Sequence, residues 1–226
     1  MLLFRNLGFY LTFYLLSTFY ILWAVSVMHF SVPMFRRAVR CWCNFHRWCL
    51  RVFVGINVET EGDKAEGAVF YAIKHESFFE ALDAPANFHW PAPFAKQELF
   101  RIPFWGWGAR IYGCVPVARE QGAKALRSMI SAAKTLSAMD RPLVIFPEGT
   151  RIPHGERGEL QAGFAGLYKL IKLPVIPVAV NSGPLYHRLL KRPGTITYKF
   201  GDPIPPGLPR EEIEARVLAA INVLND

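Results

Sequence analysis

The N-terminal segment constrains the fold of this chain more than any other feature. From Asn6 to Phe35 there is no Asp, Glu, Lys or Arg, and Leu, Phe, Tyr, Trp and Val dominate. A helix of about 20 apolar residues crosses the hydrocarbon core of a bilayer, so this segment is long enough to span one. We therefore expect a membrane-attached helical segment, with the rest of the chain folded beside it.

The charges around this segment predict its orientation. Residues 1–52 contain six Arg and no acidic residue; Arg5 precedes the apolar run and the other five follow it. Basic residues collect on the cytoplasmic side of membrane segments, so the bulk of the chain is expected to face the cytoplasm. The Arg side chains would lie near anionic lipid headgroups.

Three other interpretations of the segment remain open. A cleaved signal peptide has a shorter apolar run, and Ala24-Val25-Ser26 is a weak cleavage site. A buried core helix would also be apolar. The third is an interfacial hairpin that enters one leaflet without crossing, which hydropathy does not distinguish from a span.

Composition excludes several classes of protein. Hydrophobic residues make up 52% of the 226 residues and charged residues 19%, which excludes a disordered chain. Four Cys do not form a disulfide scaffold. The residues after 52 contain 20 of the 26 Lys and Arg and all 18 Asp and Glu, so this part of the chain is nearly neutral. We therefore expect no nucleic-acid partner.

After Arg51, short β-rich runs alternate with helical patterns. This alternation predicts an α/β fold with helices on the faces of a sheet. We expect one sheet of about seven strands over residues 52–226, preceded by the membrane-anchoring segment 1–51. The expected strands are Val52–Val58, Ala68–Ile73, Val115–Ala118, Leu143–Phe146, Val175–Val180 and Thr195–Phe200. The expected helices are Ser77–Asn87, Gly122–Met139, Phe164–Ile171 and Glu211–Leu224.

The first candidate site follows the strand that ends at Ile73. His75 lies at the strand end, and Glu80 lies five residues on, about one turn into the next helix. A carboxylate beside a His can fix its tautomer while the His accepts a proton from a hydroxyl. Ser77-x-x-Glu80 is also a capping box, so Glu80 could serve only the helix.

Two further segments carry polar groups near strand ends. Phe146–Arg151 (FPEGTR) presents a carboxylate, a hydroxyl and an Arg in one turn, and Arg binds phosphate well. Lys96–Leu99 (KQEL) begins a stretch rich in Trp and Gly that could line an acyl chain or pack in a core. Arg119 follows a short strand and could bind an anion. The apolar run Val175–Val180 can only shape a pocket.

In this order the segments resemble the PlsC-type 1-acyl-sn-glycerol-3-phosphate acyltransferases, or lysophosphatidic acid acyltransferases. That family has a His-x4-Asp motif, a Lys-x-Glu-Leu region, the FPEGTR motif and a late apolar strand. The similarity covers roughly residues 70–183, and Glu80 replaces the family's Asp. Glu80 keeps the charge with one more methylene, whereas Asp83 lies outside the motif.

The resemblance implies the glycerophospholipid acyltransferase fold and acyl transfer to a lysolipid in phospholipid biosynthesis. The donor would be acyl-CoA or acyl-carrier protein, the acceptor lysophosphatidic acid, and the product phosphatidic acid. His75 would act as general base and Glu80 would orient it. The residues implied in binding the acceptor are Lys96, Glu148, Gly149, Thr150 and Arg151, with Arg119 as a further candidate.

The residues suggest neither a cofactor nor a metal. No cluster of His, Cys, Asp and Glu has metal-ligand spacing, and Cys41, Cys43 and Cys49 near His46 are interpreted as small apolar residues or free thiols. Three other functions remain open: an acyltransferase for another acceptor, such as a lyso-ornithine lipid or another lysophospholipid; a hydrolase that uses water; and a non-catalytic membrane-attached lipid-binding protein.

Overall fold

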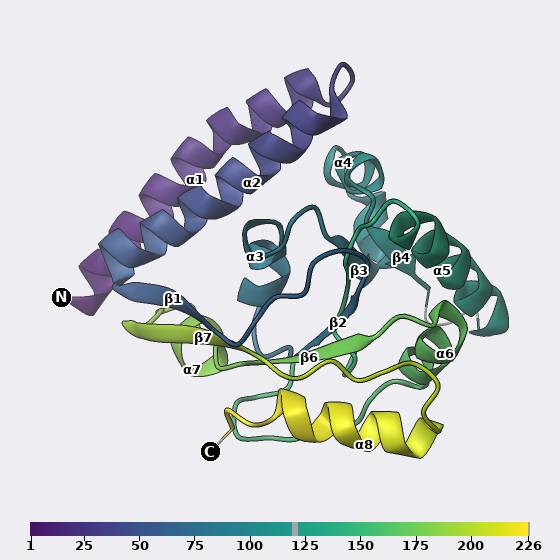
Figure 1. Ribbon diagram of the computed structural model, residues 1–226. Coiled ribbons are helices and arrows are strands. Elements are labelled where there is room, and N and C mark those ends of the chain that lie inside the picture. The colour runs from purple at the N-terminus through teal and green to yellow at the C-terminus, as the bar shows by residue number, and fades with distance from the viewer. Residues whose placement is uncertain (119–121, 226) are drawn as a thin grey trace.

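The computed structural model describes residues 1–118 and 122–225, so Arg119 lies outside the described residues. These residues form a seven-stranded sheet in the order β1-β7-β6-β2-β5-β3-β4 (Figure 1). The strands are β1 (Ile56–Glu61), β2 (Phe70–Ile73), β3 (Ala92–Lys96), β4 (Val115–Val117), β5 (Leu143–Ile145), β6 (Val175–Val180) and β7 (Gly194–Phe200). β6 and β7 pair antiparallel and the other pairs are parallel. The predicted α/β class is confirmed.

Helices cover both faces of the sheet. The α-helices are α1 (Leu2–Val27), α2 (Val32–Cys49), α3 (Phe79–Asn87), α4 (Trp105–Tyr112), α5 (Gly122–Ser137), α6 (Ala162–Ile171), α7 (Gly183–Tyr186) and α8 (Arg210–Ile221). A π-helical turn, η1 (Leu50–Val54), continues α2, and a 3-10 turn, η2 (Gln97–Arg101), follows β3.

The side chains of β2 divide the core into two layers. Tyr71 and Ile73 pack with the layer that contains α2 and α3, whereas Phe70 and Ala72 pack with α5, α6 and α8. Every residue of β2 and β6 is buried. Continuous apolar runs are typical of central strands covered on both faces, which is why these strands were visible in the sequence.

The structure corrects the expected strand Val52–Val58. Leu50–Val54 continues the helix as η1, and the strand begins only at Ile56. Gly55 separates them: its φ is 83°, and its N–H donates to the Leu50 carbonyl at 2.8 Å. Glycine adopts this left-handed conformation without the steric cost of a Cβ, so it ends the helix there.

The elements that were not predicted include β3 and α4. β3 was missed because Pro91 and Pro93 argue against a strand. α4 was missed because its sequence contains two Gly, but Gly106 is required for packing: a Cβ there would lie 2.1 Å from the Phe100 carbonyl oxygen. The Gly-rich aromatic stretch is therefore a short helix packed closely on η2.

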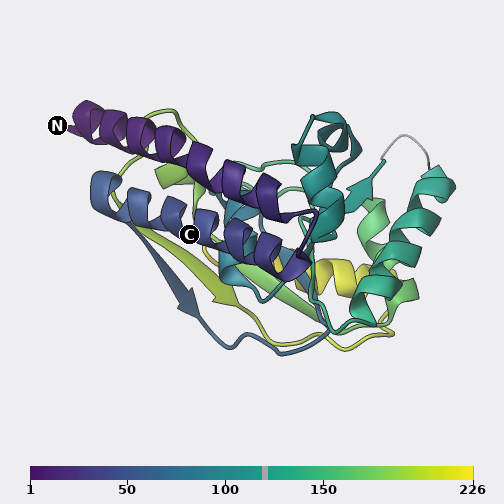
Figure 2. The ribbon, with the colours of Figure 1, turned by 90° about the horizontal axis from the view of Figure 1, so that it is seen from above.

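The apolar segment forms a hairpin of two helices instead of one helix. α1 and α2 run antiparallel side by side (Figures 1 and 2). α1 ends at Val27, and Ser31 begins α2 by accepting a hydrogen bond from the Met34 N–H at 3.3 Å, with Pro33 in the first turn. Ser at the N-cap and Pro in the first turn are strong helix-start signals.

Within the described residues, α1 is the one helix long and apolar enough to cross a membrane by length and composition. Only 11% of its apolar window is buried, so it is unlike the core helix of a soluble protein. Its exposed large apolar side chains are Leu3, Phe4, Leu7, Leu11, Tyr14, Leu15, Leu16, Phe19, Ile21 and Leu22. This surface suits α1 for association with a membrane.

Both ends of the hairpin contact the α/β part of the chain. Near the start of α1, the Tyr10 hydroxyl donates to the Leu189 carbonyl at 2.5 Å. At the tip, the His29 ring lies 4.1 Å from the Trp107 ring of α4, centroid to centroid. Figure 2 shows the two helices extending along the α/β part between these contacts.

An ion pair joins α2 to α3. Arg47 donates to both carboxylate oxygens of Asp83, at 2.5 and 2.6 Å. The Asp83 side chain is fully buried, while 27% of the Arg47 side chain is exposed. A bidentate guanidinium–carboxylate pair fixes both distance and orientation. It therefore holds the hairpin in register with the helix that carries Glu80.

Replacing Arg47 with Leu should destabilise the fold by about 3 kcal/mol, because the buried Asp83 carboxylate loses its compensating charge. Denaturant unfolding in detergent micelles measures this. The double variant Arg47→Leu/Asp83→Leu should recover much of the loss. Arg216→Leu, which breaks an exposed pair with Glu212 on α8, should cost less than about 0.5 kcal/mol. An unchanged midpoint for Arg47→Leu would show that the pair does not anchor the hairpin.

Candidate active site

The candidate site lies where three neighbouring strands end. β6, β2 and β5 are adjacent and parallel, so their carboxyl ends meet at one edge of the sheet. Lys74 and His75 follow β2, Phe146–Arg151 follows β5, and Ser182 follows β6. Open α/β sheets bind their ligands at this edge.

His75 and Glu80 form a hydrogen-bonded pair. Nδ1 of His75 lies 3.0 Å from Oε2 of Glu80. The carboxylate is fully buried, whereas 16% of the His75 side chain is exposed. With the Nδ1 proton directed at Glu80, the free lone pair of the imidazole lies on Nε2. A partly exposed His held in one tautomer can accept a proton from a substrate.

Glu80 acts in the helix start as well. Its Oε2 accepts from the Ser77 N–H at 3.1 Å, as in a capping box, and its Oε1 contacts the hydroxyls of Ser77 and Ser182. One carboxylate therefore makes both the contact to His75 and the capping-box contact. α3 itself begins at Phe79, two residues later than expected. Asp83, one turn on, pairs with Arg47 instead of approaching His75.

A buried ion pair joins the His75 segment to the FPEGTR segment. Nζ of Lys74 donates to Oε1 of Glu148 at 2.8 Å, and both side chains are fully buried. Oε2 of Glu148 accepts from the His75 N–H at 3.2 Å, and the side-chain oxygen of Asn222, the residue after α8, accepts from Lys74 at 2.8 Å. Glu148 therefore positions the backbone of His75. The Phe146 ring stacks on the His75 ring, with centroids 4.2 Å apart.

The other predicted binding residues lie at or after the ends of the neighbouring strands β3 and β5. Lys96 ends β3 and is exposed, as are Thr150 and Arg151. Gly149 occupies the turn with a φ of 68°, which suits glycine, and its N–H donates to the Phe146 carbonyl at 2.9 Å. The prediction for Arg119 falls on an undescribed residue.

Sequence reasoning missed two partners of the site. Ser182 contacts the Glu80 carboxylate. It lies two residues beyond the apolar strand β6, and a polar residue after a buried strand is a signal that could have identified it from the sequence. Glu76 accepts from Nδ1 of His154 at 2.9 Å and from the Gly183 N–H at 2.8 Å. Burial raises the pKa of Glu76. These contacts link α7 to the His75 segment across long sequence separations.

The acyltransferase family model matches residues 55–181, more than half of the chain, and this range contains His75, Glu80 and Phe146–Arg151. The chain belongs to the acyltransferase family. The family resemblance seen in the sequence is thus confirmed, and the protein is an O-acyltransferase. The catalytic roles assigned to His75 and Glu80 rest on the geometry of the pair and remain a prediction.

Individual relatives agree with this assignment. A 1-acyl-sn-glycerol-3-phosphate acyltransferase from Pseudomonas aeruginosa is 31% identical over 96% of this chain and 86% of its own. A protein of the same name from Helicobacter pylori is 37% identical over 48% of this chain and 46% of its own. The crystal structure of the lysophosphatidic acid acyltransferase PlsC from Thermotoga maritima has a TM-score of 0.80, with 22% identity, over 98% of this chain and 95% of that one. This likeness confirms the predicted fold.

Removing the Ser182 hydroxyl should slow the acyltransferase. A hydrogen bond to a charged group is worth about 1.5–3 kcal/mol. If half of that is expressed in the transition state, Ser182→Ala lowers kcat by about three- to tenfold. Initial rates at saturating acyl donor measure it, and acceptor KM should change by less than about twofold. Ser137→Ala, at the end of α5, is the matched control. An unchanged kcat would show that Ser182 does not position Glu80.

Proposed function

We propose that this acyltransferase transfers a fatty acyl group from a thioester donor to the sn-2 hydroxyl of 1-acyl-glycerol-3-phosphate, which yields phosphatidic acid. The observation that carries the proposal is the 3.0 Å pair of His75 with the buried Glu80 at the sheet edge. The names of the Pseudomonas and Helicobacter relatives support this acceptor.

The chemistry needs one general base. Nε2 of His75 accepts the proton of the hydroxyl as its oxygen attacks the thioester carbonyl. The carbon–sulfur bond then breaks, and the leaving thiolate takes the proton back from Nε2, which regenerates neutral His75. Glu80 stabilises the imidazolium formed in this step and keeps the Nδ1 tautomer. General-base assistance is typically worth about 10²–10⁴ in rate, and no acyl-enzyme is required.

The donor is acyl-CoA or acyl-carrier protein, used as a co-substrate, and no cofactor is part of the proposal. We propose that Lys96, Thr150 and Arg151 bind the lysolipid acceptor, because two cationic side chains and a hydroxyl suit a phosphate ester. Gly149 lies in the turn between Glu148 and Thr150. Glu148 contributes by holding the His75 backbone through its 3.2 Å hydrogen bond.

We also propose that the hairpin attaches the enzyme to one leaflet, with the α/β part on the cytoplasmic side. Both ends of the hairpin contact the α/β part, so the hairpin lies along it instead of projecting from it. Its outward apolar side chains would enter the lipid, and the Arg side chains of α2 would lie near headgroups. Acceptor and product both partition into that bilayer.

His75→Ala should lower phosphatidate formation by about 10²–10⁴, because the base is lost while the binding groups remain. The assay follows labelled acyl transfer from acyl-CoA or acyl-carrier protein to lysophosphatidate in detergent. Glu80→Gln should reduce kcat as well, and Glu212→Gln on exposed α8 is the matched control.

The same assay distinguishes the other functions. Thioester loss without acceptor would indicate a hydrolase. Acyl transfer only to a lyso-ornithine lipid or another lysophospholipid would show that the acceptor is that lipid and not lysophosphatidate. Lipid binding without turnover of any lysolipid would indicate a non-catalytic protein. Full activity in His75→Ala would refute the mechanism.

Polar substitutions on the outer face of α1 should weaken membrane binding. Leu11 and Leu15 are 62% and 70% exposed. Each buried Leu contributes about 1.5–3 kcal/mol, so Leu11→Gln/Leu15→Gln should lower the vesicle partition coefficient by at least about a hundredfold. Co-flotation with vesicles measures it, with exposed Val223→Gln as control. Equal flotation of the variant and the wild type would argue against this face as the anchor.

A further inference from the structure

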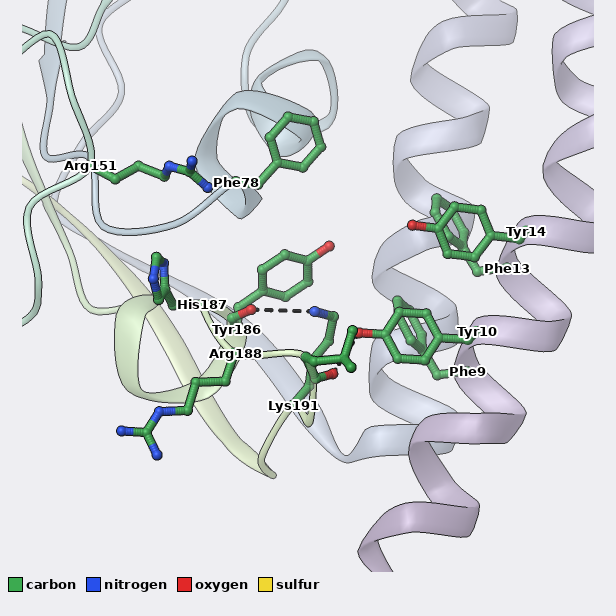
Figure 3. Close-up of a pocket in the computed structure, with 11 residues that line it drawn as sticks. Phe9, Tyr10, Phe13, Tyr14, Phe78, Arg151, Tyr186, His187, Arg188 and Lys191 are labelled. Atoms are coloured by element: carbon green, nitrogen blue, oxygen red, sulfur yellow. Dashed lines mark hydrogen bonds between the residues drawn. The ribbon is translucent and has the colours of Figure 1, made fainter.

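A cavity of about 270 Å³ lies between the first helix of the hairpin and the loop after α7 (Figure 3). Aromatic side chains of α1, including Phe9 and Tyr10, form one wall, and Tyr186 and Lys191 form another. Phe78 and Arg151 lie at the end nearest the active site. Its volume is below the usual 300–1,000 Å³ of a pocket for a whole drug-sized ligand, so it suits a headgroup.

Lys191 is a buried cation in this cavity. The residue is only 6% exposed. Its Nζ lies 3.8 Å from the centre of the Tyr186 ring and donates to the Tyr186 carbonyl at 3.3 Å. In the part of the chain that the structure describes, no carboxylate pairs with it. Burial therefore lowers the pKa of Lys191 to about 8.

Other buried cations of the protein are compensated more fully. Lys74 is paired with Glu148, and the partly buried Arg47 with Asp83. The Arg141 guanidinium donates to three backbone carbonyls, at 2.8 to 3.1 Å. A buried ammonium that has aromatic rings and a carbonyl around it but no carboxylate partner is costly, so a site that retains one is suited to a ligand that supplies the negative charge.

The position of Lys191 is built into the fold. Asn6 of α1 binds its backbone twice: the amide nitrogen donates to the Lys191 carbonyl at 3.0 Å, and the amide oxygen accepts from the Lys191 N–H at 2.8 Å. The side chain is thus held by the membrane helix and directed toward Tyr186 and the cavity (Figure 3).

We propose that Lys191 binds the phosphate of the lysolipid acceptor in this cavity, opposite Arg151, and so selects a phosphomonoester headgroup. The inference rests on the proposed function and adds a residue to its acceptor site. The ligand is anionic because Lys191, Arg151 and Arg188 all line the cavity, and it comes from the membrane because α1 forms a wall. An ammonium on a flexible stem suits a phosphate dianion, which it contacts as a point charge.

Steady-state kinetics of Lys191→Met test the proposal. Met keeps the length and apolar stem but removes the charge. The KM for lysophosphatidate should rise by about 10- to 100-fold, the range for one hydrogen bond to a charged group. The KM for the acyl donor and kcat should stay within about threefold, which a general loss of structure would not produce. Lys199→Met, an exposed lysine of β7, is the matched control.

A second measurement uses the wild-type protein and does not depend on folding of a variant. Reductive methylation of the detergent-solubilised enzyme is followed by peptide mass spectrometry. Lysophosphatidate should protect Lys191 at least about fivefold better than monoacylglycerol, which has the same chain and hydroxyls but no phosphate, because phosphate binding holds the amine protonated. Lys199 should be methylated equally with both lipids.

The outcomes separate this inference from the proposed function. If wild type makes no phosphatidate, the proposed function fails. If wild type makes phosphatidate but Lys191→Met keeps its KM, or Lys191 is methylated equally with both lipids, Lys191 is structural and the inference is overturned. A raised KM together with phosphate-dependent protection supports it.

Discussion

The fully buried pair of Lys74 and Glu148 is the contact on which the geometry of the site depends. The two residues lie 74 positions apart, at the ends of neighbouring strands β2 and β5. Burying two charges brings little net stability, but losing one partner leaves the other uncompensated, so such a pair strongly enforces its own geometry. Because Glu148 also accepts from the His75 N–H, that geometry is transmitted to His75.

Sequence reasoning recovered the parts of this arrangement that are local or periodic. The buried runs of β2, β5 and β6 were visible as apolar segments, and polar residues after them marked His75 and Phe146–Arg151. The break of the hairpin near Ser31 was not recovered, because hydropathy is continuous across it although Ser31 and Pro33 are helix-start residues. Ser182 was missed for a different reason: it acts through Glu80, 102 positions away, and only the sheet order brings the two together.

The membrane hairpin is part of the catalytic fold and not an appendage to it. Arg47 of α2 holds Asp83 on the helix that carries Glu80. His46, one residue earlier, lies 2.9 Å from the Tyr186 hydroxyl, and burial lowers its pKa to about 3, so this His is neutral. α2 supplies these structural contacts, and α1 beside it carries the exposed apolar face. Under the proposed attachment to one leaflet, the reaction takes place at the membrane surface, where a lysolipid is most concentrated.

The presence of Glu at position 80, where PlsC-type acyltransferases have Asp, is explained by the number of hydrogen-bond donors around its carboxylate. It accepts from Nδ1 of His75 and from the Ser77 N–H on one oxygen, and contacts two serine hydroxyls with the other. Two carboxylate oxygens can accept about four hydrogen bonds, so the group is saturated. The extra methylene of Glu extends this carboxylate from the first turn of α3 back to the strand end. The departure from the family pattern thus leaves a carboxylate hydrogen-bonded to His75 while the same group starts the helix.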